Sequence, residues 1–291
     1  MADWIEESRQ IHASEGYSLL CRFWKPASGP IRNRILILHG IQSHAGWYET
    51  LGRNLAARGI ETAMPDRRGS GMNRIDRGHA TSPGQLLDDI DAVYRAWRES
   101  SGAANFEAIL GGISWGGKLA VASVATRPGQ WAGLALIAPG LFAKVRPPFV
   151  TQLRIAAAAL VRPRKRFPIP LADPALFTAD PTWQRFIATD EPTLHEATAR
   201  FFVTSRILDL RLRRYASRIG CPVMLQLASS DRIIDNAKTR AYVNRLSGGE
   251  HRILEYAGAH HTLEFEGGGV SKRYADDLAD WIETLAITSE G

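Results

Sequence analysis

The sequence predicts an α/β fold with a mostly parallel central sheet and helices on both of its faces. Short apolar runs typical of strands alternate along the chain with longer segments of helical periodicity. Parallel strands need a connection that crosses over the sheet, usually a helix, so this alternation favours a parallel sheet covered on both faces. The alternation breaks once, between residues 140 and 220, which contain no convincing strand. We therefore expect a core formed by residues 1–139 and 221–291, with a helical insertion at 140–220.

Seven short runs are expected to be the strands of this core. The run at 34–38 is continuously apolar, as in a strand that is buried on both faces of a sheet. In chain order, the seven runs are 18–24, 34–38, 60–64, 107–110, 134–138, 223–228 and 252–256.

Two segments between or after these strands show clear helical patterns. In the first, Ser82 precedes Pro83 and Gln85 stands three residues after the serine, which is typical of a capping box with proline at the first helical position. Six apolar residues then share one face of the expected helix: Leu86, Leu87, Ile90, Val93, Tyr94 and Trp97. The last helix repeats the pattern over 270–282. Within the insertion we expect one helix over 149–161 and a longer one after Pro192.

A Gly-x-Ser-x-Gly pattern lies where a strand is expected to turn into a helix. Gly112, Ser114 and Gly116 follow the run 107–110 and precede a helix-like segment at 118–126. Such a turn is strained and crowded, so side chains beside the serine would clash. The serine hydroxyl then lies at the N-terminus of the helix, where free backbone N–H groups can stabilise an oxyanion. We expect Ser114 to be a nucleophile; the alternative is an ordinary glycine-rich loop.

A nucleophilic serine needs a base and a group that orients that base. Asp231 follows the expected strand 223–228, and His260 and His261 follow the expected strand 252–256. Both loops therefore lie at the carboxyl ends of strands, the edge at which open α/β sheets bind ligands. Asp235 competes with Asp231 for the role of the acid, and spacing alone does not choose between the two histidines.

Acyl transfer also requires two N–H donors directed at the oxygen that becomes negatively charged. One is expected to be the backbone N–H of Trp115, the residue after the nucleophile. The other is expected from the loop after the strand 34–38, where the backbone of Ile41 follows His39 and Gly40. We expect His39 itself to be a structural hydrogen-bonding group rather than a second base.

In this order, these segments resemble the α/β-hydrolase superfamily, and within it the branch of monoacylglycerol lipases and lysophospholipases. The matching segments are 38–40 with His44 and Tyr48, 66–71, 112–117, 230–235 and 256–264. The resemblance implies that His261 rather than His260 is the catalytic histidine, and it supports Asp231 over Asp235. It also implies that residues 140–220 form a cap, or lid, whose apolar side chains could line a pocket for an acyl chain. The segment 66–71 is expected to be structural, with arginines that brace the core.

The expected function is that of a cofactor-independent serine hydrolase that cleaves carboxylic esters through an acyl-enzyme. The resemblance implies monoacylglycerol-like or lysophospholipid-like small-molecule substrates, and no metal is expected. The same groups could instead serve an acyltransferase, a thioesterase or an amidase, and a non-catalytic ligand-binding protein of this fold is an alternative from another class. The chain departs from the family at Ile113 and Trp115, where histidine and methionine are usual, which affects the expected substrate more than the catalytic groups.

The formal net charge of +6 is concentrated in the insertion. Residues 140–220 hold fourteen Lys and Arg residues against six Asp and Glu residues, a net charge of +8, so the rest of the chain is slightly acidic. This distribution disfavours nucleic acid as a partner and suggests contact between the cap and an anionic membrane surface, with solvated arginines as the alternative. Two widely separated cysteines and the lack of a secretory signal lead us to expect a cytoplasmic protein, with or without peripheral membrane contact.

Overall fold

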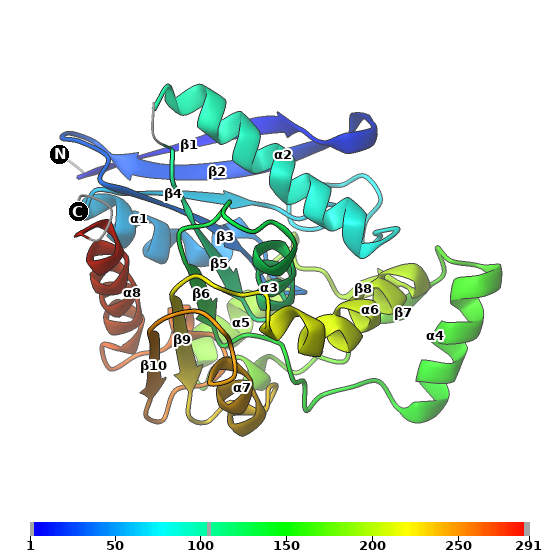
Figure 1. The fold of residues 1–291 in the computed structure, drawn as a ribbon. Coiled ribbons are helices and arrows are strands. Elements are labelled where there is room, and N and C mark those ends of the chain that lie inside the picture. Colours follow the sequence, from blue (N-terminus) through cyan, green and yellow to red (C-terminus); the bar gives the residue numbers. More distant parts are fainter. Residues whose placement is uncertain (1–2, 104–105, 288–291) are drawn as a thin grey trace.

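A computed structural model describes residues 3–103 and 106–287, and an eight-stranded sheet crosses the molecule (Figure 1). In their spatial order the strands are β1 (Trp4–His12), β2 (Ser18–Pro26), β4 (Ile60–Pro65), β3 (Asn33–Leu38), β5 (Ile109–Ile113), β6 (Leu134–Ile137), β9 (Val223–Ala228) and β10 (His251–Tyr256). β2 pairs antiparallel with both β1 and β4, and all the other neighbours pair parallel. The predicted α/β class with a mostly parallel sheet is confirmed.

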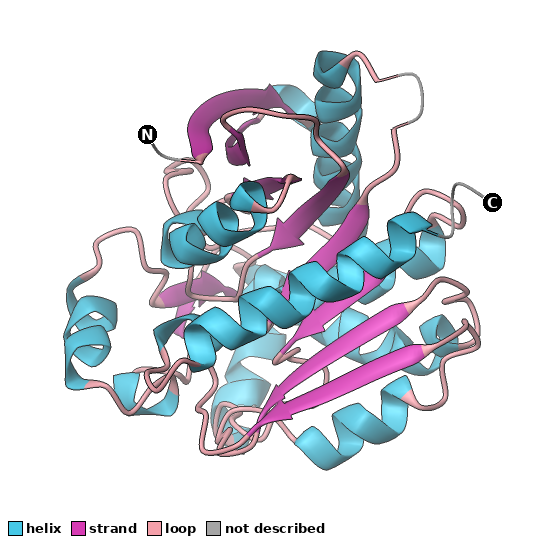
Figure 2. Cartoon of the chain, turned by 90° about the vertical axis from the view of Figure 1, so that its left-hand side faces the viewer, coloured by secondary structure: helices cyan, strands magenta, loops and turns pink. Residues whose placement is uncertain are grey.

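Helices cover both faces of the sheet, as Figure 2 shows. α1 (Glu49–Ala57) and α8 (Val270–Ile287) pack together on one face, and α2 (Pro83–Ser101) and α3 (Gly116–Thr126) pack together on the other. α7 (Asn236–Val243) lies against β9. Most of the large apolar side chains of the strands are buried between these layers, which explains why most of the core strands are continuous apolar runs in the sequence.

Residues 140–220 form a separate group of elements between β6 and β9. The helices are α4 (Phe149–Val161), α5 (Pro181–Thr189) and α6 (Ala199–Ala216), and a two-stranded ribbon pairs β7 (Arg166–Pro168) with β8 (Glu196–Thr198). α4 lies at the margin of the molecule, away from the central sheet (Figure 1). The expectation that this segment contains no strand was wrong. β7 and β8 pair only with each other and are three residues long, which is too short to give a recognisable sequence pattern.

The helix after Pro192 also begins later than expected, at Ala199. Residues 196–198 are extended in β8, and the Thr198 side chain then caps α6 by accepting a hydrogen bond from the backbone N–H of Phe201. The cap of α2 follows the prediction more closely. The Ser82 side chain accepts from the N–H of Gln85, whereas the Gln85 side chain accepts from the N–H of Thr81 rather than from that of the serine.

The sequence analysis missed β1, the antiparallel edge strand of the sheet. Its residues alternate between partly exposed and exposed, and only Ile11 is buried, so the strand lacks an apolar signal. β5 was expected at 107–110 but runs from Ile109 to Ile113, because its two glycines interrupt the apolar pattern.

Four short 3₁₀ helices complete the described elements: η1 (Ser14–Gly16), η2 (Ala45–Tyr48), η3 (Pro174–Leu176) and η4 (Leu263–Phe265). η2 and η4 follow the loops after β3 and β10, and so lie at the carboxyl edge of the parallel strands. Within the described ranges, no helix is both long enough and apolar enough to cross a membrane.

Candidate active site

Ser114 occupies the tight turn between β5 and α3. Its φ is +51°, a left-handed conformation that is strained for a residue with a side chain. A Cβ atom on Gly112 would lie 2.6 Å from the Cα of Gly117, and one on Gly116 would lie 2.2 Å from the carbonyl oxygen of Leu38. These contacts explain why the positions two residues before and two residues after the serine are both glycine.

Two loops at the same edge of the sheet bring an acid and a base to this serine. His261 follows β10, and its Nε2 lies 2.8 Å from the Oγ of Ser114. Asp231 follows β9, and its Oδ2 lies 2.6 Å from the Nδ1 of His261. Because a carboxylate accepts at Nδ1, that nitrogen carries the proton and Nε2 is left to accept the proton of the serine. The structure therefore brings together the three residues that the sequence analysis selected.

The carboxylate of Asp231 is buried and fully hydrogen-bonded. Its other oxygen, Oδ1, accepts from the backbone N–H groups of Ile233 and Ile234 at 2.7 and 3.0 Å. Burial alone would raise the pKa of Asp231, but His261 and these two N–H groups outweigh it and hold the pKa below its ordinary value. The carboxylate is therefore ionised near neutral pH and can stabilise a positive charge on the imidazole.

The two competing residues face elsewhere. Asp235 caps α7, where its side chain accepts from the N–H of Lys238 and pairs with the ammonium group of that residue at 2.9 Å. The Nδ1 of His260 lies 3.5 Å from a carboxylate oxygen of Glu266. Their surroundings thus differ from those of Asp231 and His261. At the sequence level, the choice of His261 over His260 required the family resemblance, and the resemblance supported the choice of Asp231 over Asp235.

The expected oxyanion donors, Ile41 and Trp115, both line the cavity beside Ser114. Within the described residues, neither backbone N–H donates a hydrogen bond to another group of the protein. The loop that carries Ile41 approaches the serine closely, since a Cβ atom on Gly40 would lie 3.3 Å from the Cβ of Ser114. Two unpaired N–H groups beside a serine are suited to bind an oxygen that gains negative charge.

A cavity of about 440 Å³ opens over Ser114 between the core and residues 140–220. Most of its lining is apolar and comes from both parts of the chain, including Leu141, Phe142, Ile155, Ile169, Phe202, Leu212 and Ile233. One side is polar: the ammonium group of Lys118 on α3 pairs with Asp209 on α6 at 2.5 Å. Such a cavity fits a ligand with a long apolar part and a small polar part.

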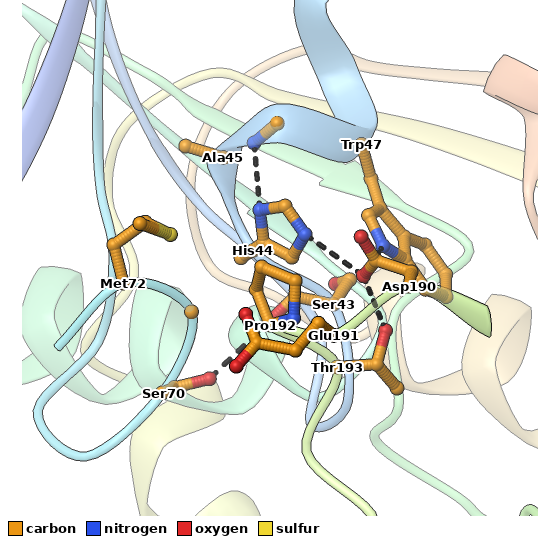
Figure 3. A network of polar contacts seen from close by, with 12 residues as sticks. Ser43, His44, Ala45, Trp47, Ser70, Met72, Asp190, Glu191, Pro192 and Thr193 are labelled. Atoms are coloured by element: carbon orange, nitrogen blue, oxygen red, sulfur yellow. Dashed lines mark hydrogen bonds and ion pairs between the residues drawn. The ribbon is translucent and has the colours of Figure 1, made fainter. Parts of the chain in front are cut away.

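A partly buried polar network, which was not predicted from the sequence, holds residues 190–193 against the core (Figure 3). Oδ2 of Asp190 accepts from the Nε2–H of His44 at 3.0 Å, from the indole of Trp47 at 3.1 Å and from the hydroxyl of Thr193 at 2.5 Å. Nδ1 of His44 accepts from the N–H of Gly46, which fixes the proton on Nε2. Burial alone would raise the pKa of Asp190, but these donors outweigh it and lower the pKa to about 2. No sequence pattern links residues so far apart in the chain.

The contacts of Arg67 differ from what was expected for this segment. The arginines of 66–71 were expected to brace the core, and Arg68 does so, through a buried pair with Asp89 at 2.6 Å. The side chain of Arg67 instead contacts the loop that carries Ile41. Nothing in the sequence distinguishes the two adjacent arginines. In the described part of the chain, no group of three or more His, Cys, Asp and Glu side chains is placed to hold a metal ion.

Known proteins match this chain over most of its length. A family model described as serine aminopeptidase, S33 matches residues 29–268. Human monoglyceride lipase is 25% identical over 286 residues, which cover 95% of this chain and 90% of that protein. The monoacylglycerol lipase of Mycolicibacterium smegmatis is 23% identical over 285 residues, which cover 96% of this chain and 98% of that protein.

Solved structures share the fold. The monoacylglycerol lipase of Paleococcus ferrophilus matches with a TM-score of 0.81 and 21% identity over 92% of this chain and 99% of that one. A soluble variant of the Saccharomyces cerevisiae monoglyceride lipase, in complex with a substrate analogue, matches with a TM-score of 0.85 and 18% identity over 97% of this chain and 96% of that one. The expected α/β-hydrolase architecture is confirmed by these likenesses.

Proposed function

The chain belongs to the serine aminopeptidase S33 family, and from this premise we propose that it is a serine hydrolase that cleaves carboxylic esters. The observation that carries the proposal is the continuous chain of contacts from Asp231 through His261 to Ser114. Each member has the partner that its role requires, and the serine lies in a strained turn beside two unpaired N–H groups.

The reaction follows from these contacts. The Oγ of Ser114 attacks the ester carbonyl while Nε2 of His261 takes its proton, and Asp231 stabilises the imidazolium that forms. The N–H groups of Ile41 and Trp115 bind the negative oxygen of the tetrahedral intermediate. His261 then donates the proton to the leaving alcohol, which leaves an acyl group on Ser114. A water molecule deprotonated by His261 releases the acid, and the serine regains its proton.

The substrate class that we propose is a monoacylglycerol-like or lysophospholipid-like ester. The apolar lining of the cavity suits an acyl chain, and curated relatives that cover almost the whole chain are named monoglyceride or monoacylglycerol lipases. Residues 140–220 act as a cap in this proposal, because they supply one wall of the cavity. The backbone N–H of Thr262 donates to the carbonyl of Phe177, so this segment also rests directly on the loop that carries His261.

The same residues could hydrolyse an amide or a thioester, and the description of the family refers to an aminopeptidase. The names of the relatives and structural neighbours favour the ester. A set of p-nitrophenyl esters and the matching p-nitroanilides of equal acyl length separates these reactions. We expect turnover of the esters to exceed that of the anilides, and the reverse order would contradict the proposed substrate class.

We also propose that the cap contacts an anionic membrane surface. Five apolar side chains of α4 are exposed, namely Phe149, Val150, Leu153, Leu160 and Val161. Basic residues lie on the same helix and directly after it, and all are exposed: Arg154, Arg162, Arg164, Lys165 and Arg166. An apolar surface beside clustered positive charge is suited to anionic lipid. This contact would bring the cavity close to its lipid substrate.

Replacing the nucleophile tests the proposed enzyme most directly. We expect Ser114→Ala to lower kcat for p-nitrophenyl butyrate by about 10⁵- to 10⁶-fold, because the attacking atom is lost. A fluorophosphonate probe should label the wild-type protein at Ser114 and leave the variant unlabelled. Retained ester hydrolysis in the variant would exclude this mechanism, and a wild-type protein that neither turns over esters nor takes the label would be a binding protein instead.

A further inference from the structure

The side chain of Arg67, in the loop after β4, reaches the backbone of the loop after β3. Its two terminal nitrogens donate to the carbonyl oxygens of Gly40 and Ile41 at 3.0 and 3.1 Å. In the described part of the chain, no carboxylate pairs with the guanidinium of Arg67. The guanidinium of its neighbour Arg68, in contrast, pairs with Asp89. Arg67 is therefore a cation whose partners are backbone carbonyls next to the nucleophile.

The Gly40 carbonyl belongs to the same peptide group as the N–H of Ile41, which is one of the two proposed oxyanion donors. A hydrogen bond to the oxygen of a peptide group draws electron density from its nitrogen, so the N–H becomes a stronger donor. The same bond fixes the plane of the peptide and hence the direction in which the N–H points. Arg67 thus acts on the donor from the far side of the peptide, without touching the substrate.

His39 adds a second donor to the same carbonyl. Its Nε2 lies 2.9 Å from the backbone nitrogen of Arg67, so this ring nitrogen accepts and the proton is on Nδ1. Nδ1 lies 2.8 Å from the oxygen of Gly40 and therefore donates to it. Burial and the nearby Arg67 guanidinium lower the pKa of His39 well below its ordinary value, so the imidazole is neutral. The Gly40 oxygen is held from two sides, by a neutral ring and by a cation.

Arg67 also contacts the second oxyanion donor. Its guanidinium lies 4.8 Å from the ring centre of Trp115, on the face of the indole, and 5.2 Å from that of Phe201. The indole N–H of Trp115 donates to the hydroxyl of Ser205 on α6 at 2.9 Å. Arg67 therefore contacts both residues that supply the proposed oxyanion donors: Ile41 through its backbone carbonyl and Trp115 through its ring. Burial lowers the pKa of Arg67 to about 9, so the guanidinium still carries its charge at neutral pH.

We propose that Arg67 is a positioning residue of the oxyanion hole, which orients and polarises the Gly40–Ile41 peptide through its carbonyl and fixes Trp115 by stacking on its ring. This inference rests on the proposed function, because it assigns a role in a reaction that passes through an oxyanion. It predicts that the loss of Arg67 weakens the binding of the transition state and leaves the binding of the substrate almost unchanged.

Two substitutions at this position and one matched control test the inference. Arg67→Met keeps an unbranched side chain about as far as the Nε of the arginine and removes all its donors and its charge. Arg67→Lys keeps the charge but lacks the planar fork whose two terminal nitrogens reach the two carbonyls. Arg77→Met is the control, because Arg77 lies in the same region and also donates to backbone carbonyls, those of Gly71 and Thr193 at 2.7 and 3.2 Å, but not to the loop 39–41. The melting temperature of each variant shows whether it is folded.

For Arg67→Met we expect kcat on p-nitrophenyl butyrate to fall about 10- to 100-fold, less than for the direct removal of an oxyanion donor, with KM within about threefold of the wild type. The inhibition constant of an alkyl trifluoromethyl ketone, which forms a tetrahedral oxyanion on the serine, should rise by the same factor as kcat/KM falls. Arg67→Lys should recover part of both effects, and Arg77→Met should change kcat less than threefold.

Two results would overturn the inference in a folded Arg67→Met protein: a kcat within threefold of the wild type, or a loss confined to KM with an unchanged inhibition constant. If only Arg67→Met fails to fold, the test passes to Arg67→Lys, where a kcat/KM that falls without a matching rise of the inhibition constant, or a kcat and inhibition constant both equal to those of the wild type, would overturn the inference. These results differ from a failure of the proposed function, in which the wild-type protein itself shows no turnover that depends on Ser114.

Discussion

The two sides of the cavity differ in how their polar and apolar groups are placed. On the core side, the loops that approach Ser114 contain buried polar side chains with defined partners, such as His39, His44, Asp66, Asp231 and His261. On the outer side, α4 exposes five large apolar side chains to solvent and packs inward with only a small apolar cluster that includes Ile155 and Ala158. The proposed catalytic groups thus lie where polar groups are buried, and the proposed membrane contact lies where apolar groups are exposed.

The physical reason lies in the cost of burial. A buried polar group without a partner costs about 1–3 kcal/mol, so the core loops have little freedom to place their side chains differently. An exposed leucine or valine carries no comparable constraint. Substitutions in the core loops should therefore change rate or stability strongly, and substitutions of the exposed apolar residues of α4 should change only what the protein binds.

Asp231→Asn should have the largest effect of these substitutions. An amide at this position cannot stabilise the imidazolium and favours the wrong tautomer of His261, so kcat should fall by about 10⁴-fold with little change in fold. Steady-state hydrolysis of p-nitrophenyl butyrate at neutral pH measures it. Asp235→Asn is the matched control, since Asp235 caps α7 and contacts none of the three residues; it should keep kcat within a few-fold. Equal losses in the two variants would show that Asp231 has no special role.

Glu264→Gln should change how stability depends on pH. Glu264 lies in η4, three residues after His261, and accepts from the backbone N–H of Leu51 at 3.1 Å and from the hydroxyl of Tyr274. Burial, only partly offset by these donors, raises the pKa of this carboxyl from 4.5 to about 7. Because the folded-state value is the higher one, the stabilisation is complete below pH 4.5 and is lost as the pH rises through about 7.

The loss amounts to about 3 kcal/mol in the free energy of unfolding, most of it between pH 5 and 8. Urea unfolding across this pH range gives the free energy of unfolding of the wild type and of Glu264→Gln. The advantage of the wild type in this free energy should shrink, or reverse in favour of the variant, as the pH rises. Glu99→Gln, at an exposed position of α2, should leave the pH dependence as it is in the wild type. A constant difference between wild type and Glu264→Gln at every pH would contradict the assignment.

The contrast between buried and exposed segments also explains how much of the fold could be predicted. The expected strand at 223–228 has the bounds of β9, because a strand buried on both faces is a continuous apolar run. The edge strand β1 and the short ribbon of β7 with β8 were missed, since a half-exposed or three-residue strand carries little apolar signal. The start of α6 was placed too early because the pairing of β8, a tertiary contact, overrides local helical periodicity.

The candidate site could be predicted where sequence motifs mark it and not where distant segments meet. Ser114, Asp231 and His261 each follow a strand at the same edge of the sheet, and the structure places them within hydrogen-bonding distance. The contacts of Arg67 with the loop 39–41 and of Asp190 with His44 join separate loops, and no local pattern predicts them. Arg67 and Arg68 are adjacent residues of the same type, so the sequence does not distinguish them. Only their contacts in the structure separate their roles.

The smallest effect on the folded enzyme should come from α4. Leu160 and Val161 are exposed at 86% and 78%, at the end of the helix that leads into the basic residues 162–166. Replacing both by serine removes apolar surface that is mostly exposed to water in the free protein, so the free energy of unfolding should stay within about 0.5 kcal/mol of the wild type. Turnover of p-nitrophenyl butyrate should also be unchanged, because neither side chain lines the cavity.

Membrane binding is where this double variant should differ from the wild type. The wild-type protein should co-sediment with vesicles that contain both phosphatidylcholine and phosphatidylglycerol, and less of it should co-sediment with vesicles of phosphatidylcholine alone. High salt should reduce its binding to the anionic vesicles, since screening weakens the attraction of the basic residues. The Leu160→Ser, Val161→Ser protein should lose most of this binding. Ile75→Ser is the control, because Ile75 is equally apolar and 70% exposed but lies in a core loop outside the insertion. If the two variants bind alike, α4 is not the contact, and the exposed apolar residues of the insertion have no role that separates them from those of the core.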